Sequence, residues 1–366
     1  MKMRLLAAAS IAACFAAPVF ADNSHDFDSN GALTLAVIGD WPYNNLLLDN
    51  AGLLTASVNA DRHVRFLLHV GDIHSGSQPC TSAAILPPIA TSNPGWNQAV
   101  FQRFQQFNVP VIYTPGDNEW TDCHKSKEKS AGDPLKELAA VRGLFFSRPG
   151  VTLGRNEMPV ITQARGFDRA FPNDAQFVEN VIWMSSRVLF VTLNVPGSNN
   201  DTVAWTGTFA NSAAQALEVQ MRDAANGRWL DAAFDLAADT HAKALVLAIQ
   251  ADMWDPAALA PGADGLNAYT PLVQHLATRA LAFGRPVLLL NGDSHLYEAD
   301  QPLADPNSPT GRIHNTPAVG NLTRITVQGS TNAPAEWLRL TIDTSHTPAF
   351  TWTNVPYCAD PNAQCQ

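Results

Sequence analysis

The sequence predicts an α/β fold that forms one large domain, and two observations support this. Segments of strand composition alternate with helical segments up to about residue 320, and the chain then continues as strands without helices. Five predicted strands end in acid, amide or imidazole side chains, and these endings extend from Asp40 to His295. Because ligands bind beyond the carboxyl ends of strands in open α/β sheets, this spread favours one domain around one site.

The predicted strands are short apolar runs rich in β-branched residues, and they cover 33–39, 64–71, 109–114, 188–193, 244–249, 286–292, 323–327, 337–342 and 349–353. The predicted helices have apolar residues at helical spacing and cover 46–60, 96–107, 135–146, 213–241 and 271–283. Asp133-Pro134 is typical of an N-cap followed by the first helical residue. Asn226-Gly227 is a candidate break in the longest helix.

The polar strand endings form five blocks, which read Gly39-Asp40-Trp41-Pro42, Gly71-Asp72-Ile73-His74, Gly116-Asp117-Asn118-Glu119, Gln250-Ala251-Asp252 and Gly292-Asp293-Ser294-His295. A single acid after a strand is commonly a turn residue, because Asp hydrogen-bonds its own backbone. Five strands that all end in metal-competent groups instead indicate a cation site.

In order, strand context and spacing, the five blocks resemble the motifs of the calcineurin-like metallophosphoesterases over about residues 33–343. That family has Asp-x-His, Gly-Asp-x-x, Gly-Asn-His-Asp/Glu, a lone His and Gly-His-x-His. Here the family residues are replaced at Pro42, Asp117-Asn118, Gln250 and Asp293. The resemblance implies a diverged branch with the calcineurin-like fold, a two-sheet β-sandwich flanked by helices in α/β/β/α layers.

The resemblance also implies a site for two divalent metal ions. The first ion would be held by Asp40, Asp72 and His295. The second ion would share Asp72 and add Asp117, Gln250 and Asp293. If the register of the third block shifts by one residue, Asn118 becomes the ligand in place of Asp117. Five of these six ligands present oxygen, so Mn²⁺, Mg²⁺ or Ca²⁺ is expected in preference to Zn²⁺.

The leaving group of an ester hydrolase needs a proton donor, which in the family is the His after the Asn ligand. Asn118 occupies that position here and cannot donate a proton in the same way. His74, two residues after Asp72, and His124, next to Cys123, are candidates for the role. The alternative is that both are exposed loop histidines outside the chemistry. His69 lies within a predicted strand and is interpreted as a packed or supporting histidine.

The N-terminal residues 1–21 have the pattern of a secretory signal peptide, with Lys2 and Arg4 before an apolar stretch and cleavage after Ala21. An alternative is a lipoprotein cleavage box that ends at Cys14. Residues 22–32 are interpreted as a linker and 33–366 as the domain, including the C-terminal strands and tail. The apolar stretch is too short for a membrane span, and no other segment is apolar enough for one.

Four cysteines remain after removal of the signal peptide, and an even number in an exported chain favours disulfides. Four cysteines allow three connectivities, of which we favour Cys80–Cys123 with Cys358–Cys365. The first pair would join the loop after Asp72 to the loop after Asp117. These features together predict a periplasmic or secreted protein.

The net charge of −10, from 33 acids and 23 Lys plus Arg, comes without the basic stripe of a nucleic-acid-binding surface. The function implied by the resemblance is an exported metal-dependent hydrolase of small-molecule phosphate esters, either monoesters or diesters. The alternative is a non-catalytic member of the same fold that binds a metal or ligand in the cell envelope. The sequence does not indicate an oligomeric state.

Overall fold

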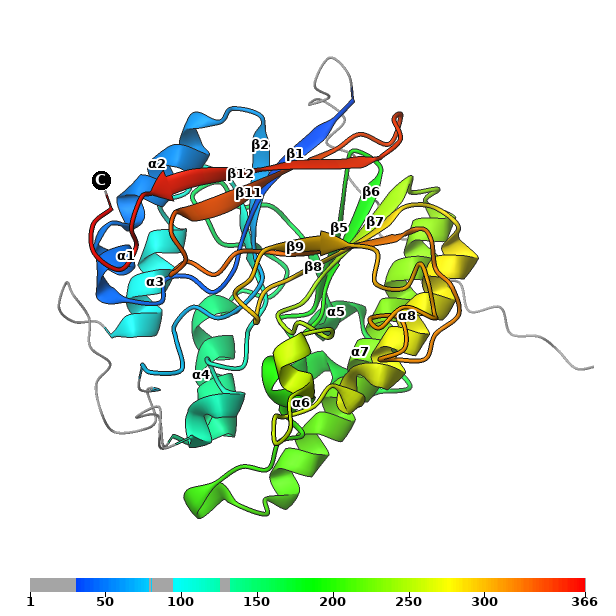
Figure 1. The fold of residues 1–366 in the computed structure, drawn as a ribbon, viewed down its shortest axis with the longest axis horizontal. Helices are drawn as coiled ribbons and strands as arrows, with labels where there is room; N and C mark the ends of the chain where they lie inside the picture. The colour runs from blue at the N-terminus through cyan, green and yellow to red at the C-terminus, as the bar shows by residue number, and fades with distance from the viewer. Residues whose placement is uncertain (1–30, 79, 81–94, 126–131, 366) are drawn as a thin grey trace, which may run out of the picture.

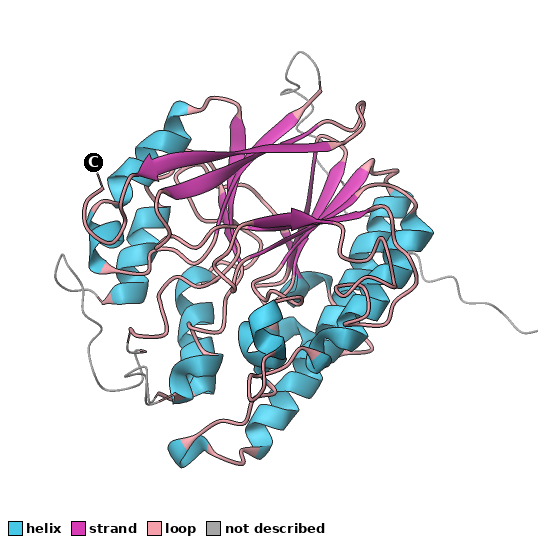
Figure 2. Ribbon diagram, in the orientation of Figure 1, coloured by secondary structure: helices cyan, strands magenta, loops and turns pink. Residues whose placement is uncertain are grey.

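The computed structural model describes residues 31–78, 80, 95–125 and 132–365. The predicted signal peptide, Cys14 and most of the predicted linker therefore lie outside the described residues. Two sheets face each other, with helices on their outer sides (Figure 1). Figure 2 shows the same arrangement, with the strands in magenta between two sets of cyan helices.

The first sheet has the strand order β12-β11-β1-β2-β3. Its strands are β1 (Leu33–Ile38), β2 (Val64–His69), β3 (Val111–Tyr113), β11 (Ala335–Ile342) and β12 (Phe350–Cys358). β1, β2 and β3 are parallel, whereas β11 is antiparallel to both β1 and β12. The first described strand therefore pairs with a strand from the end of the chain, with Leu33 opposite Ile342.

The second sheet has the strand order β4-β5-β6-β7-β8-β10-β9. Its strands are β4 (Ile161–Thr162), β5 (Val181–Ser185), β6 (Val188–Thr192), β7 (Ala244–Ala248), β8 (Val287–Asn291), β9 (Glu298–Asp300) and β10 (Leu322–Thr326). β6, β7, β8 and β10 are parallel, and the outer strands are antiparallel to their neighbours. The sequence patterns predicted the parallel strands but missed β4, β5 and β9.

The helices are α1 (Asn45–Asp49), α2 (Ala51–Ala60), α3 (Trp96–Phe104), α4 (Pro134–Phe145), α5 (Gln163–Gly166), α6 (Gly197–Asp201), α7 (Ala213–Asp239) and α8 (Thr270–Phe283). Asp133 caps α4 as predicted, because its side chain accepts a hydrogen bond from the backbone N of Leu135. Two expectations were wrong: the single helix over 46–60 is divided at Asn50, and α7 continues through Asn226 without a break.

Three apolar clusters define the layers. The inner faces of the two sheets pack on each other through residues such as Phe66, Phe190 and Leu288. The outer face of the first sheet packs on α1 to α4, and the outer face of the second packs on α7 and α8. The four-layer α/β/β/α arrangement implied by the resemblance is therefore confirmed. Among the residues described, none of the helices has both the length and the apolar character needed to cross a membrane.

Candidate metal centre

The carboxyl ends of strands from both sheets meet in one place, and the five sequence blocks lie there. Asp40 follows β1, Asp72 follows β2 and Asp117 follows β3, all in the first sheet. Gln250 follows β7, and Asp293 and His295 follow β8 in the second sheet. The strands before these loops are fixed in position, because the apolar side chains of the strands are buried on both faces of each sheet. The strands therefore hold the ends of the loops in place.

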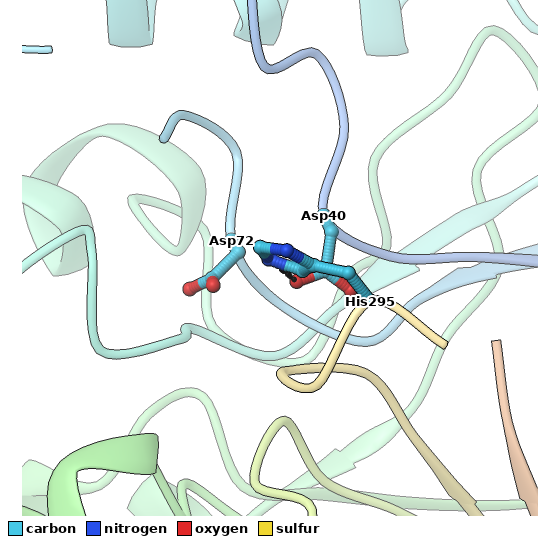
Figure 3. Close-up of side chains that lie close together, drawn as sticks. All are labelled: Asp40, Asp72 and His295. Atoms are coloured by element: carbon cyan, nitrogen blue, oxygen red, sulfur yellow. Dashed lines mark ion pairs between the residues drawn. The ribbon is translucent and has the colours of Figure 1, made fainter. Parts of the chain in front are cut away.

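The first group of metal-competent side chains comprises Asp40, Asp72 and His295, at the ends of three separate loops (Figure 3). Each offers one ligand atom, and these atoms lie within 4.8 Å of one another. The His295 Nε2 atom is 3.2 Å from Asp40 Oδ1. Both carboxylates are buried, but the His295 side chain is 42% exposed, so the group opens to solvent on its side.

The second group comprises Asp72, Asp117 and Asp293, again with ligand atoms within 4.8 Å of one another. Asp72 belongs to both groups, so it is the carboxylate that they share. The Gln250 Nε2 atom donates hydrogen bonds to Asp117 Oδ1 and Asp293 Oδ1, both at 3.0 Å. Its Oε1 atom accepts one from the backbone N of Gly197 at 2.5 Å. Gln250 thus presents nitrogen to this group, and its carboxamide would have to turn over to act as an oxygen ligand.

Two glycines allow the backbone to approach these carboxylates closely. A Cβ atom on Gly116 would lie 2.0 Å from Asp72 Oδ1. A Cβ atom on Gly197 would lie 2.6 Å from Asp117 Oδ2 and 2.7 Å from Asp293 Oδ1. All three distances are far inside van der Waals contact, so any larger residue would displace a carboxylate of the site.

The backbone of the site is held in an uncommon conformation. Asp40, Asp72, Asp293 and His295 have φ values of 50°, 59°, 75° and 63°, in the left-handed region. Non-glycine residues in this region carry a conformational cost of about 1–3 kcal/mol each and persist where the surroundings determine them. Their concentration in four of the six predicted ligands points to a functional site.

The carboxyl groups raise one another's pKa. Burial, followed by the charges of Asp117 and Glu119, raises the pKa of Asp72 well above its usual range. Burial and Asp117 do the same to Asp293, and burial with Asp122 raises the pKa of Asp117 to about 7. Burial works to lower the pKa of His295, but the hydrogen bond to Asp40 and the negative charges of Asp40 and Asp117 together outweigh burial and raise the pKa. A cation would relieve the repulsion that these shifts express.

Tyr43 is a central residue of the site that sequence reasoning missed. Its hydroxyl oxygen lies 2.6 Å from Asp72 Oδ2, 3.0 Å from Asp40 Oδ1 and 3.1 Å from His295 Nε2. Asn118 Nδ2 donates to the same hydroxyl at 3.1 Å and to Asp72 Oδ2 at 3.0 Å. The available signal was its position three residues after Asp40, in a block that lacks the family's histidine.

The two candidate proton donors are buried rather than exposed on loops. His74 Nδ1 donates to the backbone oxygen of Ser75 at 3.0 Å, and the His74 side chain is buried. His124 Nδ1 accepts from the backbone N of Thr206 at 3.0 Å, and burial lowers the pKa of His124. In the described part of the chain, neither histidine is hydrogen-bonded to any of the six predicted ligands.

Supporting residues surround the second group. Ser198 Oγ donates to Asp122 Oδ1 at 2.6 Å and lies 3.4 Å from Asp117 Oδ2. Lys125 forms an ion pair with Asp122 and donates to Ser198 Oγ at 3.0 Å. The backbone N of Asp252 donates to Asp293 Oδ2 at 3.1 Å. Lys125 therefore brings positive charge close to Asp117, and this charge acts to lower the Asp117 pKa.

His69 has the supporting role that the sequence indicated. It is fully buried at the end of β2, and its Nε2 atom donates to the backbone oxygen of Trp41 at 2.8 Å. Burial lowers the pKa of His69 to about 4, so the ring is neutral. His69 therefore ties the loop after β1, which carries Asp40 and Tyr43, to β2.

Both favoured disulfides are present. Cys80 and Cys123 are bonded with their Cα atoms 5.8 Å apart, and Cys358 and Cys365 with theirs 4.3 Å apart. The first disulfide joins the loop after β2 to the 3₁₀ turn at Thr121–His124 after β3, next to the site. Disulfides are typical of proteins in oxidising, extracytoplasmic environments.

Comparison with known proteins gives no family assignment from sequence, since no family model and no curated protein matches the chain. Among solved structures, GAP50, the anchor in the inner membrane complex of Plasmodium, is 10% identical with a TM-score of 0.45, covering 90% of each chain. The Thermus thermophilus sulfate thiohydrolase SoxB in complex with glycerol is 14% identical with a TM-score of 0.34, covering 86% of this chain and 42% of its own. At these values, the likenesses carry no argument about function, and the fold is defined by the strand order and layers themselves.

Proposed function

We propose that the chain is a metal-dependent hydrolase of small-molecule phosphate esters, monoesters or diesters, that acts in the periplasm or as a secreted protein. The observation that carries this proposal is the pair of metal-competent groups that share Asp72 at the carboxyl ends of two sheets. A shared carboxylate is suited to hold two cations close together. Two adjacent divalent ions activate water, orient a phosphoryl group and neutralise charge on the attacking and leaving oxygens.

The residues present fit divalent cations. Asp40 Oδ2 is buried and has no hydrogen-bond partner among the described residues, which is costly for a carboxylate unless a cation neutralises it. Asp40, Asp72 and His295 would hold the first ion. Asp117 and Asp293, together with Asp72, would hold the second, with Gln250 as a further ligand if its carboxamide turns over. The predominance of oxygen favours Mn²⁺, Mg²⁺ or Ca²⁺ over Zn²⁺.

The chain's own side chains would bind the substrate and supply the proton. Lys125, close to Asp117 through Ser198, provides positive charge for an anionic phosphate ester. Asn118, whose Nδ2 atom donates to Asp72 Oδ2 and to the Tyr43 hydroxyl, would hold these groups in position for the substrate. His124 or His74 would donate the proton to the departing oxygen, the role that Asn118 cannot perform.

The alternative function is a non-catalytic member of the fold that binds a metal or ligand in the cell envelope. Two observations favour it. Asn118 replaces the family's proton donor, and the Gln250 amide already donates to both carboxylates that would hold the second ion. A protein that binds one cation at Asp40, Asp72 and His295 without hydrolysis would correspond to this alternative.

The deciding experiment is a screen of metal-stripped protein against p-nitrophenyl phosphate and bis(p-nitrophenyl) phosphate with each of Mn²⁺, Mg²⁺, Ca²⁺ and Zn²⁺. The proposal expects hydrolysis that depends on added cation and is lost in Asp72→Ala. Cation binding without hydrolysis of either substrate would support the alternative. Mass spectrometry of the mature protein tests the predicted cleavage after Ala21 and the lipid-bearing Cys14 alternative in the same preparation.

A further inference from the structure

The Gln250 side chain connects the second metal-competent group to the loop after β6. It is fully buried, and its Nε2 atom donates to Asp117 Oδ1 and to Asp293 Oδ1, both at 3.0 Å. A carboxamide has two N–H donors, so both are used in these bonds. Its Oε1 atom accepts from the backbone N of Gly197 at 2.5 Å. The amide therefore bridges the two carboxylates that would hold a second cation.

The direction in which this amide faces is set by Gly197. A backbone N–H can only donate, so the atom opposite it has to be an acceptor. If the amide turned over, Nε2 would take the place of Oε1, and two donors would face each other 2.5 Å apart. The stem of the side chain is packed as well, because a Cβ on Gly71 would lie 2.6 Å from Gln250 Cβ and 2.5 Å from its Cγ. Gln250 is therefore held with its donors towards the carboxylates.

The Gly197 N–H is itself fixed, because α6 is a turn of uncommon backbone conformation. Four successive non-glycine residues of α6 have φ between 50° and 60°. A left-handed run of this kind is unfavourable for L-residues and persists where the surroundings determine it. Here Asn199 Nδ2 donates to Asn267 Oδ1 at 2.8 Å, and the fully buried Arg222 donates to the backbone oxygen of Asn200 at 3.0 Å. Two distant parts of the chain therefore hold the turn that presents this N–H to Gln250.

We propose that Gln250 makes the two cation groups unequal in affinity. The first group, which contains none of the atoms that Gln250 bonds, holds its ion firmly, whereas the second group binds its ion weakly. To bind there, an ion must take both carboxylates from the amide, and a buried N–H of Gln250 or of Gly197 then has no acceptor. A loss of this kind lowers affinity by about 5- to 150-fold. The second ion is therefore the exchangeable one, and its occupancy follows the free concentration of divalent cations. The inference rests on the cation site of the proposed function but not on hydrolysis.

The test uses Gln250→Met, which removes the amide and nearly keeps the length of the side chain. If the amide competes with the second ion, its removal strengthens binding of that ion, whereas removal of a ligand would weaken it. Gln163→Met is the matched control, because Gln163 is also buried and its amide bonds Ala225 and Asn180, which lie outside both groups. Equilibrium dialysis of chelator-treated protein against a series of free Mn²⁺ concentrations, followed by metal analysis, gives the number of bound ions and their affinities.

We expect wild type and Gln163→Met to bind one Mn²⁺ firmly and a second at least about 5-fold more weakly, and Gln250→Met to bind the second about 5- to 150-fold more tightly than wild type. The affinity for the first ion should be equal in all three proteins, which also shows that Gln250→Met is folded. If Gln250→Met does not fold, Gln250→Glu decides, because one of its oxygens can accept from Gly197 while the other faces the ion. Two ions of equal affinity in wild type, or a second ion that the folded variant binds no more tightly than wild type does, would each overturn the inference.

The failure of this inference is distinct from failure of the proposed function. Hydrolysis by wild-type protein that binds two ions with equal affinity would leave the hydrolase proposal standing and remove the competing role of Gln250. Unequal binding of two ions without hydrolysis of either p-nitrophenyl substrate would do the reverse. Wild-type protein that binds no cation would refute both.

Discussion

Replacing Asp72 by asparagine removes the charge that both candidate cation groups share and nearly preserves the shape of the side chain. Burial, Asp117 and Glu119 raise the pKa of Asp72 in the cation-free protein, so its ionised form is unfavourable there. We therefore expect cation-free Asp72→Asn to melt at or above the temperature of cation-free wild type. Wild type should become the more stable of the two proteins only when cations are added.

The size of that difference follows from binding linkage. An ion at 100 times its dissociation constant stabilises the folded state by about 2.7 kcal/mol. An unfolding entropy of about 2.1 cal/mol/K per residue gives about 0.7 kcal/mol/K for the roughly 330 residues of the domain. One ion should therefore raise the melting temperature of wild type by about 4 °C and two ions by about 8 °C, whereas Asp72→Asn should show almost none of this increase.

The assay is thermal unfolding after treatment with a chelator, followed by titration with Mn²⁺, Mg²⁺ or Ca²⁺. Asp201→Asn is the matched control, because Asp201 is a buried carboxyl with a raised pKa that lies in neither cation group. Asp201→Asn should show the same increase in melting temperature on cation addition as wild type. A wild-type increase that persists in Asp72→Asn, or no increase in wild type, would refute the reasoning.

Because four carboxylates make up most of the candidate ligand set, Mn²⁺, Mg²⁺ or Ca²⁺ should restore more phosphatase activity to metal-stripped protein than zinc at equal free concentration; restoration by zinc alone would contradict this. If His124 or His74 is the proton donor, its change to Ala should slow hydrolysis of alkyl phosphates by up to about 10²–10⁴-fold and of nitrophenyl phosphate far less. Equal losses across a leaving-group series would exclude that histidine. Burial raises the pKa of Asp201 from 3.8 to about 8, so the stability it contributes is fully present below pH 3.8 and is lost as the pH rises through 8. The free energy of unfolding of Asp201→Asn, measured in urea, should therefore rise relative to that of wild type by up to about 1.4 kcal/mol per pH unit between pH 3.8 and 8. A difference between the two proteins that stays constant with pH would contradict this prediction. Gly197→Ala should weaken binding of one ion, because its Cβ would press on two carboxylates of the second group; Gly143→Ala, where the added atom meets open space, is its control, and equal ion binding by the two variants would disprove the clash.

Much of the fold and the placement of the site could be predicted because both depend on local sequence. An apolar run such as the one before Gly39 identifies a strand, and the acid after it marks the end of that strand. β5 was missed because its turn to β6 uses Ser186 and Arg187, both with positive φ, in place of the usual Asn-Gly signal. The division of the first predicted helix at Asn50 was likewise not indicated by hydrophobic spacing.

The composition of the site was less predictable, because contacts between distant segments determine it. Tyr43 contacts Asp72 and His295, which are 29 and 252 residues away in the sequence. No short sequence motif indicates contacts of this kind. The orientation of the Gln250 amide depends on the backbone N of Gly197, which requires an acceptor. Sequence alone therefore indicates the residue types at the site, and tertiary contacts determine which atoms face a cation.

The pairing of β1 with β11 has a consequence for the order in which the protein folds. β1 lies between β2 and β11, and its partner in β11 begins at Ala335, forty residues after His295. A chain that ends between His295 and Ala335 would contain every predicted ligand, but one edge of β1 would be unpaired. Contacts of such long range make folding slow. We expect a chain that ends before Ala335 to lack a formed cation site, because β1, which positions Asp40, would be without its partner β11.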